Sequence, residues 1–347
     1  MFLEQIGADS CVAELFRPHA TGGLELGRVS FAAHEQYRIY LETTECEAAP
    51  AGRLRWGDDL PAVGDWVAAR RIEPALALIE VVLPRQTRFS RRAAGRGVVE
   101  QVIAANVDLA AVVCGLDGDF NLRRLERYLI LVRESGAAPI VVLNKADLCE
   151  SVAERVDDVA RLGAGARAIA ICAQATVEPL RALIRGRTVA LLGSSGAGKS
   201  TIANGLLGEE RQATAAVRAT DSRGRHTTTN RMLLPLPGGG AIIDNPGMRE
   251  LQLWASQDSL EGVFQDVAEA AGHCRFRDCT HRNEPGCAVR IALDSGEIDA
   301  ARWLSYRKLE AELRHASLEQ DPLAKAARTK KWKAIHKAMR NHPKYRR

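Results

Sequence analysis

Residues 193–200 fit G-x-x-x-x-G-K-S, the pattern of a loop that binds nucleotide phosphates, and a threonine follows. Glycines at three positions let the backbone fold around an oxyanion with its N–H groups pointing inward. Lys199 can reach the terminal phosphates, and the Ser200 hydroxyl is a candidate Mg²⁺ ligand. An apolar strand over 188–192 and a helix over 199–207 would place the phosphates at a helix N-terminus. The expected phosphate-binding residues are Gly193, Ser194, Ser195, Gly196, Ala197, Gly198, Lys199, Ser200 and Thr201.

A second motif, N-K-x-D, follows an apolar strand over 138–143 and comprises Asn144, Lys145, Ala146 and Asp147. The Asp147 carboxylate can accept hydrogen bonds from the ring N–H and the amine that guanine has and adenine lacks. Adenine would leave polar groups of the site unpaired, which disfavours its binding. Cys172 and Ala173 follow another strand end and are candidates to donate backbone N–H groups to the guanine oxygen. A helix N-cap would also explain Asp147.

Residues 244–247 match D-x-x-G, the motif that senses the γ-phosphate. Asp244 would hold Mg²⁺ through water, and the Gly247 N–H would contact the γ-phosphate. A threonine run over 227–229 offers Thr228 as a Mg²⁺ ligand. An ordinary Asn-Pro-Gly turn and a hydrophilic loop are the alternatives for these two segments.

The sequence offers one candidate for the residue that orients the attacking water, and it lies outside D-x-x-G. Ras-like GTPases have a glutamine after D-x-x-G, and Met248 occupies that position here. His226 is the candidate catalytic residue, because an imidazole can hydrogen-bond a water near neutral pH. A structural or RNA-contacting role for His226 remains the alternative.

A spacing of C-x₄-C-x-H-x₅-C near the C-terminus supplies three thiolates and one imidazole, from Cys274, Cys279, His281 and Cys287. This is a complete tetrahedral zinc set with no position left for water, so we expect one structural ion. His273, beside Cys274, is a rival ligand, and a cluster of free cysteines is the metal-free alternative.

The charge of the chain is unevenly distributed. Its 347 residues have a formal net charge of +5, yet residues 325–347 contain ten Lys or Arg and no acid. The rest of the chain is therefore near −5. Such a tail favours a polyanionic partner, nucleic acid before membrane, with a solvated helix end as the alternative.

No apolar run approaches the ~18 residues that span a bilayer. Glu4 lies where a signal peptide would be basic, so we expect a cytoplasmic protein that binds no membrane.

The distribution of strands and helices predicts a multidomain chain. Residues 1–90 have short β-prone segments, at 27–31, 37–41 and 65–69, and suit a small OB-like β-barrel that binds RNA. Residues 91–253 alternate strands and helices, which is typical of an α/β domain with a mostly parallel sheet. Residues 254–347 form a mostly helical zinc-binding domain with the basic tail. A basic connector over 85–96 contacts RNA or is a solvated linker.

The order of the motifs differs from that of Ras-like GTPases, since N-K-x-D comes before the phosphate loop. Because each motif lies at a strand end of one sheet, the same pocket forms after circular permutation. We therefore expect a circularly permuted P-loop GTPase domain. Permutation attaches the C-terminal domain directly after Gly247.

The chain resembles the ribosome small-subunit-dependent GTPase A family (RsgA, also called YjeQ) in five motifs. They are, in order, N-K-A-D, G-S-S-G-A-G-K-S-T, G-R-H-T-T-T, D-N-P-G and the Cys/His motif. The resemblance covers about 98–289. It implies an OB barrel, a permuted GTPase domain and a zinc domain. It also implies Mg²⁺-dependent GTP hydrolysis stimulated by the small (30S) ribosomal subunit during its late maturation. Asn245, where threonine is usual, and Cys172, where serine is usual, depart from the family pattern.

Two other functions remain open from the sequence. One is a GTP-gated RNA-binding switch with negligible turnover, and the other is a permuted GTPase that acts on another RNA. In every case the expected partners are GTP or GDP and an RNA, and we expect a monomer.

Overall fold

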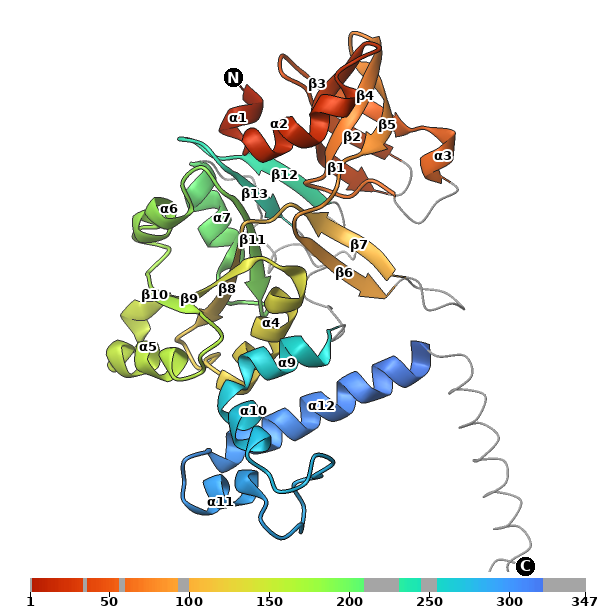
Figure 1. The fold of residues 1–347 in the computed structure, drawn as a ribbon. Coiled ribbons are helices and arrows are strands. Elements are labelled where there is room, and N and C mark those ends of the chain that lie inside the picture. The colour runs from red at the N-terminus through yellow and green to blue at the C-terminus, as the bar shows by residue number, and fades with distance from the viewer. Residues whose placement is uncertain are drawn as a thin grey trace, which may run out of the picture.

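The computed structural model describes residues 2–33, 36–55, 60–92, 100–208, 231–244 and 255–320. Figure 1 shows a β-barrel, an α/β domain and a group of C-terminal helices, in that order along the molecule. This architecture confirms the expected fold class.

The N-terminal barrel consists of five strands, each paired with two neighbours. They are β1 (Leu24–Ala33), β2 (Gln36–Tyr40), β3 (Glu45–Pro50), β4 (Trp66–Glu73) and β5 (Leu76–Val82). The ring β1–β2–β3–β5–β4–β1 leaves no free sheet edge and encloses an apolar core around Val29, Ile39 and Ile79. Short helices α1 (Phe2–Gln5), α2 (Ser10–Phe16), η1 (Arg17–His19) and α3 (Gly52–Arg55) flank the ring.

The basic connector contains β6 (Arg88–Arg92), which forms a hairpin with the next strand, β7 (Glu100–Ala105). Among the described strands these two pair only with each other. Several of its arginines already have protein partners. Arg85 forms an ion pair with the buried Asp65 (Nη2–Oδ2 2.8 Å), and Arg91 Nε donates to Gln101 Oε1 at 3.1 Å. Residues 93–96 of the connector lie outside the described ranges.

The α/β domain contains a sheet of six strands in the order β10-β9-β8-β11-β13-β12. Its strands are β8 (Leu109–Gly115), β9 (Ala138–Asn144), β10 (Arg167–Ala170), β11 (Thr188–Gly193), β12 (Arg231–Pro235) and β13 (Ala241–Asp244). All neighbours are parallel except β12 and β13. The expected, mostly parallel sheet is therefore confirmed, and the strands predicted over 138–143 and 188–192 begin as expected and each continue one residue further.

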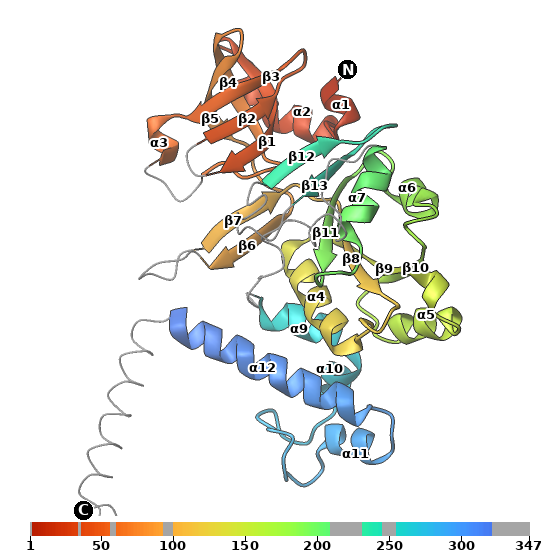
Figure 2. The ribbon, with the colours of Figure 1, turned by 180° about the vertical axis from the view of Figure 1, so that it is seen from behind.

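Helices cover both faces of this sheet (Figure 2). They are α4 (Leu122–Ser135), α5 (Val152–Ala160), α6 (Glu178–Ile184) and α7 (Lys199–Leu207), with a short η2 (Ala146–Leu148) after β9. Alternate residues of β8 point to opposite faces. Ala110 and Val112 join the core under α4, and Ala111 and Val113 join the core under α6 and α7.

The barrel and the α/β domain share one continuous sheet, because β1 pairs with β12 as well as with β2 and β4. The register joins Phe31 to Met232 and Ala32 to Arg231. Arg28, which is 1% exposed, reinforces the junction. Its Nη2 donates to Thr188 Oγ1 (2.8 Å) and to the Asn106 carbonyl (3.1 Å).

The C-terminal part consists of α9 (Gln257–Val263), α10 (Gln265–Gly272), α11 (Ala288–Asp294) and α12 (Ala300–Gln320). Of these helices, α9 and α12 pack against α4, and α10 packs against α9 and α11. Apolar residues of this part, including Phe264, Tyr306 and Leu309, join the core of one face of the sheet. No described helix has the length and apolar character needed to cross a membrane.

Candidate functional site

The two nucleotide motifs lie at the same edge of the sheet. β9 ends at Asn144 and β11 ends at Gly193, and β8 lies between these strands. All three strands are parallel, so the residues that follow each of them meet at the carboxyl edge, where ligands of α/β sheets bind.

Asn144 joins the motifs to one another. Its side chain is buried (3% exposed), and its Nδ2 donates to the Ala197 carbonyl of the phosphate loop at 2.9 Å. Its Oδ1 accepts from the Ala173 N–H at 3.0 Å. One amide therefore connects N-K-x-D, the phosphate loop and the Cys172–Ala173 segment, which are far apart in the sequence.

This contact requires a glycine at position 198. A Cβ at Gly198 would lie 2.1 Å from Asn144 Nδ2, and the φ of +95° is one that other residues rarely adopt. Gly193 is similarly constrained, since its Cβ would lie 2.1 Å from the Val113 carbonyl oxygen of β8. The glycines of the motif therefore serve the packing of the loop onto the sheet as well as its curvature.

The phosphate loop turns directly into α7, which begins at Lys199. Lys199 Nζ reaches back over the loop and donates to the carbonyls of Gly193 (2.7 Å) and Ser194. Ser195 and Gly196 are exposed, and Ser200 and Thr201 lie partly exposed in the first turn of α7. Backbone N–H groups at such a helix start are available to an anion.

In the guanine motif, Lys145 has a left-handed backbone (φ +62°), and its Nζ forms an ion pair with Asp117. Ala146 donates its N–H to the Ile171 carbonyl at 3.1 Å, which holds the motif against the Cys172 segment. The side chain of Asp147 is exposed in η2 at this edge.

The remaining expected site residues lie at the end of β13 or outside the described residues. Asp244 ends β13, two strands from β8 in the same sheet. His226, Thr228 and Gly247 lie outside the described residues.

Two acidic residues at this edge were missed by the sequence analysis. Asp117 and Asp119 follow β8, and Asp119 accepts hydrogen bonds from Ser194 Oγ of the phosphate loop and from Arg124 Nη1 of α4. Burial acts to raise the pKa of Asp119, but the hydrogen bonds from Ser194 and Arg124 outweigh it and lower the pKa. Their position in the sequence could have identified them, because they follow β8, which lies between the two strands that end in the nucleotide motifs.

A sequence model of the RsgA GTPase family matches residues 82–254. A protein of Opitutus terrae named "Small ribosomal subunit biogenesis GTPase RsgA" is 45% identical, over 98% of this chain and 97% of its own. A protein of the same name from Syntrophotalea carbinolica is 42% identical, over 96% of both chains. The chain belongs to the RsgA GTPase family.

Two solved structures have the same fold. YjeQ from Thermotoga maritima is 24% identical, with a TM-score of 0.63 over 84% of this chain and 98% of its own. YloQ, described as a circularly permuted GTPase, is 22% identical, with a TM-score of 0.62 over 86% and 98%. The RsgA resemblance drawn from the motifs is thus confirmed, and members of this family are GTPases.

The structure also brings together the expected Cys/His cluster, between α10 and α11. The ligand atoms of Cys274, Cys279, His281 and Cys287 all lie within 4.8 Å of one another. His281 Nδ1 is 3.5 Å from the sulfurs of both Cys274 and Cys287, and these sulfurs are 3.9 Å apart. A tetrahedral zinc with ordinary bond lengths needs separations of roughly 3.6 Å for N–S and 3.8 Å for S–S. The donor set therefore fits zinc.

The rival ligand His273 has another partner. It is the C-cap of α10, and its Nδ1 lies 3.0 Å from the Glu269 carbonyl oxygen of the preceding turn. His281 instead projects into the cluster from a left-handed backbone (φ +56°). The Trp303 ring of α12 packs edge-on against His281, with ring centroids 5.9 Å apart.

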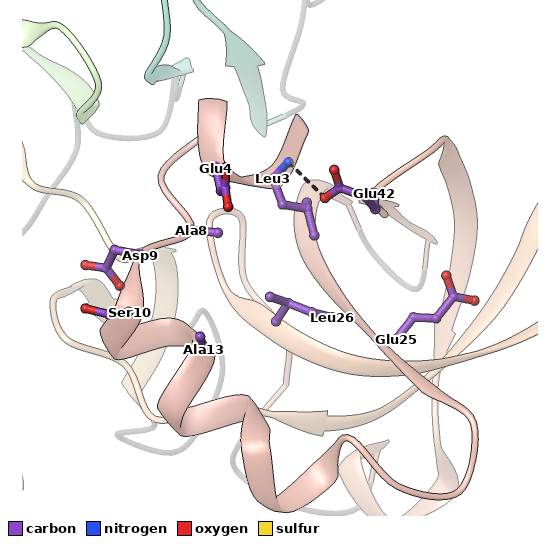
Figure 3. A pocket seen from close by; sticks show the side chains of 9 residues that line it. All are labelled: Leu3, Glu4, Ala8, Asp9, Ser10, Ala13, Glu25, Leu26 and Glu42. Atoms are coloured by element: carbon purple, nitrogen blue, oxygen red, sulfur yellow. Dashed lines mark hydrogen bonds between the residues drawn. The ribbon is translucent and has the colours of Figure 1, made fainter. Parts of the chain in front are cut away.

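A cleft of about 740 Å³ lies between the N-terminal helices and β1, away from the nucleotide motifs (Figure 3). It is lined mainly by acidic and apolar side chains, and at least two of its four carboxylates have structural roles. Glu42 accepts the Phe2 N–H of α1 at 2.8 Å, and Glu25 forms an ion pair with Arg71 at 2.9 Å. This cleft is therefore part of the attachment of α1 and α2 to the barrel, and we assign it no ligand.

Proposed function

We propose that the chain is a GTPase that binds the small ribosomal subunit and assists its late maturation. GTP is hydrolysed to GDP and phosphate, and the bound subunit stimulates the turnover. The observation that carries the proposal is the Asn144 junction, which joins a guanine motif and a phosphate loop at one sheet edge.

Each motif has a role in this reaction. Asp147 selects guanine, with backbone groups of Cys172 and Ala173 at the guanine oxygen and Asn144 and Lys145 shaping the pocket. The loop from Gly193 to Thr201 holds the phosphates. Ser200 and Thr228 would bind Mg²⁺ directly and Asp244 through water, and the ion would neutralise charge on the phosphates. His226 orients the attacking water, and Gly247 contacts the γ-phosphate.

The partner follows from the names of the relatives, which describe small-subunit biogenesis, and from the charge of this chain. The ten basic residues over 325–347 suit rRNA phosphates. The closed barrel supports a second RNA contact, since barrels of this kind bind nucleic acid.

The proposed domains are a barrel over 1–90, a GTPase domain over 91–253 and a zinc domain with the tail over 254–347. The protein acts as a monomer in the cytoplasm.

Zinc in this proposal is structural. Cys274, Cys279, His281 and Cys287 would supply all four ligands, so the ion would stabilise the segment between α10 and α11 and leave no position for a substrate. That segment is short and has few apolar residues, so metal binding would provide much of its folding free energy.

The test is GTP hydrolysis by the full chain, measured alone and with purified 30S subunits. We expect slow turnover alone and a large increase with subunits. Binding of both GTP and subunits without turnover would favour the GTP-gated switch. Stimulation by a different RNA, recovered by crosslinking, would favour the third function.

Two variants separate the nucleotide roles in the same assay. Asp147→Asn should weaken GTP binding and favour xanthosine triphosphate, because an amide can face the xanthine carbonyl. Lys199→Ala should lose affinity and turnover together. Equal hydrolysis of ATP and GTP by the wild type would contradict the guanine assignment.

A further inference from the structure

The turn after β8 touches both nucleotide motifs. Asp117 pairs with Lys145 of the guanine motif, and Asp119 accepts the Ser194 hydroxyl of the phosphate loop. A Cβ at Gly115 would lie 2.5 Å from Asp117 Oδ1, so the turn folds back closely on the strand end. The segment 116–121 is thus packed into the nucleotide edge.

The same segment continues into α4. Asn121 is the N-cap of this helix, and its Oδ1 accepts the Arg124 N–H at 3.1 Å. Arg124 then returns its guanidinium to Asp119. Asp119 therefore lies between the phosphate loop and the first turn of α4, and any tilt of the helix acts on both contacts.

The C-terminal helices rest on α4 through buried charges. Glu126 has no exposed side-chain surface and accepts from Arg302 Nη1 (3.1 Å) and Ser305 Oγ (2.6 Å) of α12. Arg302 in turn pairs with Asp266 of α10 at 2.6 Å. Because polar partners are expensive to separate in a buried site, movement of α12 is transmitted to α4.

We propose that the segment 116–121 links the C-terminal helices to the nucleotide site, with Asp119 as its positioning residue. The path runs from Arg302 and Ser305 to Glu126, back two residues along α4 to Arg124, and through Asp119 to Ser194. Asp119 sets the phosphate loop in the conformation that receives the nucleotide. This inference rests on the proposed GTPase function and adds a route that does not pass through the D-x-x-G segment.

The first experiment measures GTP and GDP affinity in the full chain without subunits. Asp119→Ala should weaken binding by about tenfold, the effect of losing one hydrogen bond to a charged group. Asp119→Asn should recover most of it, because an amide oxygen still accepts from Ser194. The double variant Asp119→Ala with Ser194→Ala should bind no more weakly than the worse single variant, since both remove one interaction.

Asp158→Ala is the matched control. Asp158 has an exposure similar to that of Asp119 (21% and 23%) and pairs with two arginines, but it lies on α5, and none of its contacts in the described part of the chain is with a nucleotide motif. Its removal should leave affinity unchanged. If Asp119→Ala and Asp158→Ala bind GTP equally well, Asp119 is a structural residue and the inference is wrong.

The second experiment tests the link itself by subunit-stimulated turnover. Ser305→Ala removes the contact with Glu126 and should reduce the stimulated kcat severalfold while KM for GTP changes little. In the Asp119→Ala background it should have no further effect. An equal reduction in both backgrounds would show that the signal bypasses Asp119. A wild type that binds no guanine nucleotide would instead overturn the proposed function, and the link with it.

Discussion

The barrel and the C-terminal helices are attached to the GTPase domain in different ways. The barrel adds its strand β1 to the edge of the α/β sheet, where β1 pairs with β12 through backbone groups, and the buried Arg28 reinforces this junction. The C-terminal helices use side chains, with the Glu126–Arg302 pair at the centre of an apolar interface. Backbone pairing tolerates many side chains, whereas a buried ion pair fails when either partner is lost.

The two attachments also reach different parts of the nucleotide site. β12 begins at Arg231, three residues after Thr228, so the barrel is connected to the threonine run that is expected to bind Mg²⁺. The C-terminal helices act on α4, whose first turn is connected to the phosphate loop through Asp119. A subunit that touches both outer parts would therefore act on the nucleotide from two sides. The following predictions test the difference between the attachments, from the largest effect to the smallest.

Loss of zinc should unfold the Cys/His segment while α12 stays docked on α4. Cys279→Ser should abolish zinc binding and unfold residues 274–287, because structural zinc contributes on the order of 10 kcal/mol to such segments. The docking of α12 should persist, since Arg302 and Glu126 are not ligands. Zinc content and amide hydrogen exchange of α12 measure the two effects.

Cys11→Ser is the control, since Cys11 is an exposed thiol on α2, outside the Cys/His cluster. It should change neither measurement. If α12 loses its protection together with zinc, the metal holds the whole C-terminal part and the ion pair is secondary.

Removing the buried carboxylate should loosen the C-terminal helices more than removing Arg28 loosens the barrel junction. Glu126→Ala leaves Arg302 buried with one partner fewer, and we expect a loss of about 3–5 kcal/mol in local stability. Hydrogen exchange of α9 and α12 measures it. Arg161→Ala, which breaks an exposed pair with Asp158, should cost less than about 1 kcal/mol. Similar costs for the two variants would contradict the role given to the buried pair.

At the barrel junction, Arg28→Met should cost about 2–3 kcal/mol, because it leaves buried acceptors on Ile6, Asn106 and Thr188 without a donor. Burial lowers the pKa of Arg28 to about 10, so the guanidinium is still charged at neutral pH. The backbone pairing of β1 and β12 should survive. Thermal unfolding and exchange of the β1 amides measure the change, with Arg70→Met, at a half-buried pair with Glu80, as the control. Complete loss of protection at Phe31 would show that Arg28 carries the junction alone.

These contacts mark the limit of what the sequence could predict. The phosphate loop, N-K-x-D and the Cys/His spacing were identifiable because their chemistry requires given residue types at fixed separations. Strand and helix periodicity gave the α/β sheet and the barrel. Arg28 meets Thr188 across 160 residues, and Arg302 is one of several arginines of its helix, so neither has a local signal. Asp119 resembles an ordinary turn residue until the fold brings Ser194 to it.

The smallest predicted effect compares two carboxyls of α4 that both face the C-terminal helices. Burial raises the pKa of Glu126 above its ordinary value of 4.5, despite hydrogen bonding from Ser305 and the charges of Arg123 and Arg302. Glu134 is exposed overall, yet its carboxyl is partly shielded from water, which acts to raise its pKa; hydrogen bonds from Ser256 and Ser259 outweigh this and lower the pKa. The two groups therefore affect stability in opposite directions as the pH changes.

For Glu126, the folded protein holds the proton more tightly than the unfolded chain, so its contribution is complete below about pH 4.5 and is lost as the pH rises through the folded pKa. For Glu134, the contribution is present above about pH 4.5 and is lost as the pH falls through the folded pKa. The cost of Glu134→Gln should thus shrink on acidification, by less than about 1 kcal/mol because Glu134 is exposed. The cost of Glu126→Gln should shrink as the pH rises. Urea unfolding of both variants from about pH 4 to about pH 7 measures the slopes. The same substitution at two sites of one helix makes each variant the control for the other, and slopes of equal sign would contradict this account of the interface.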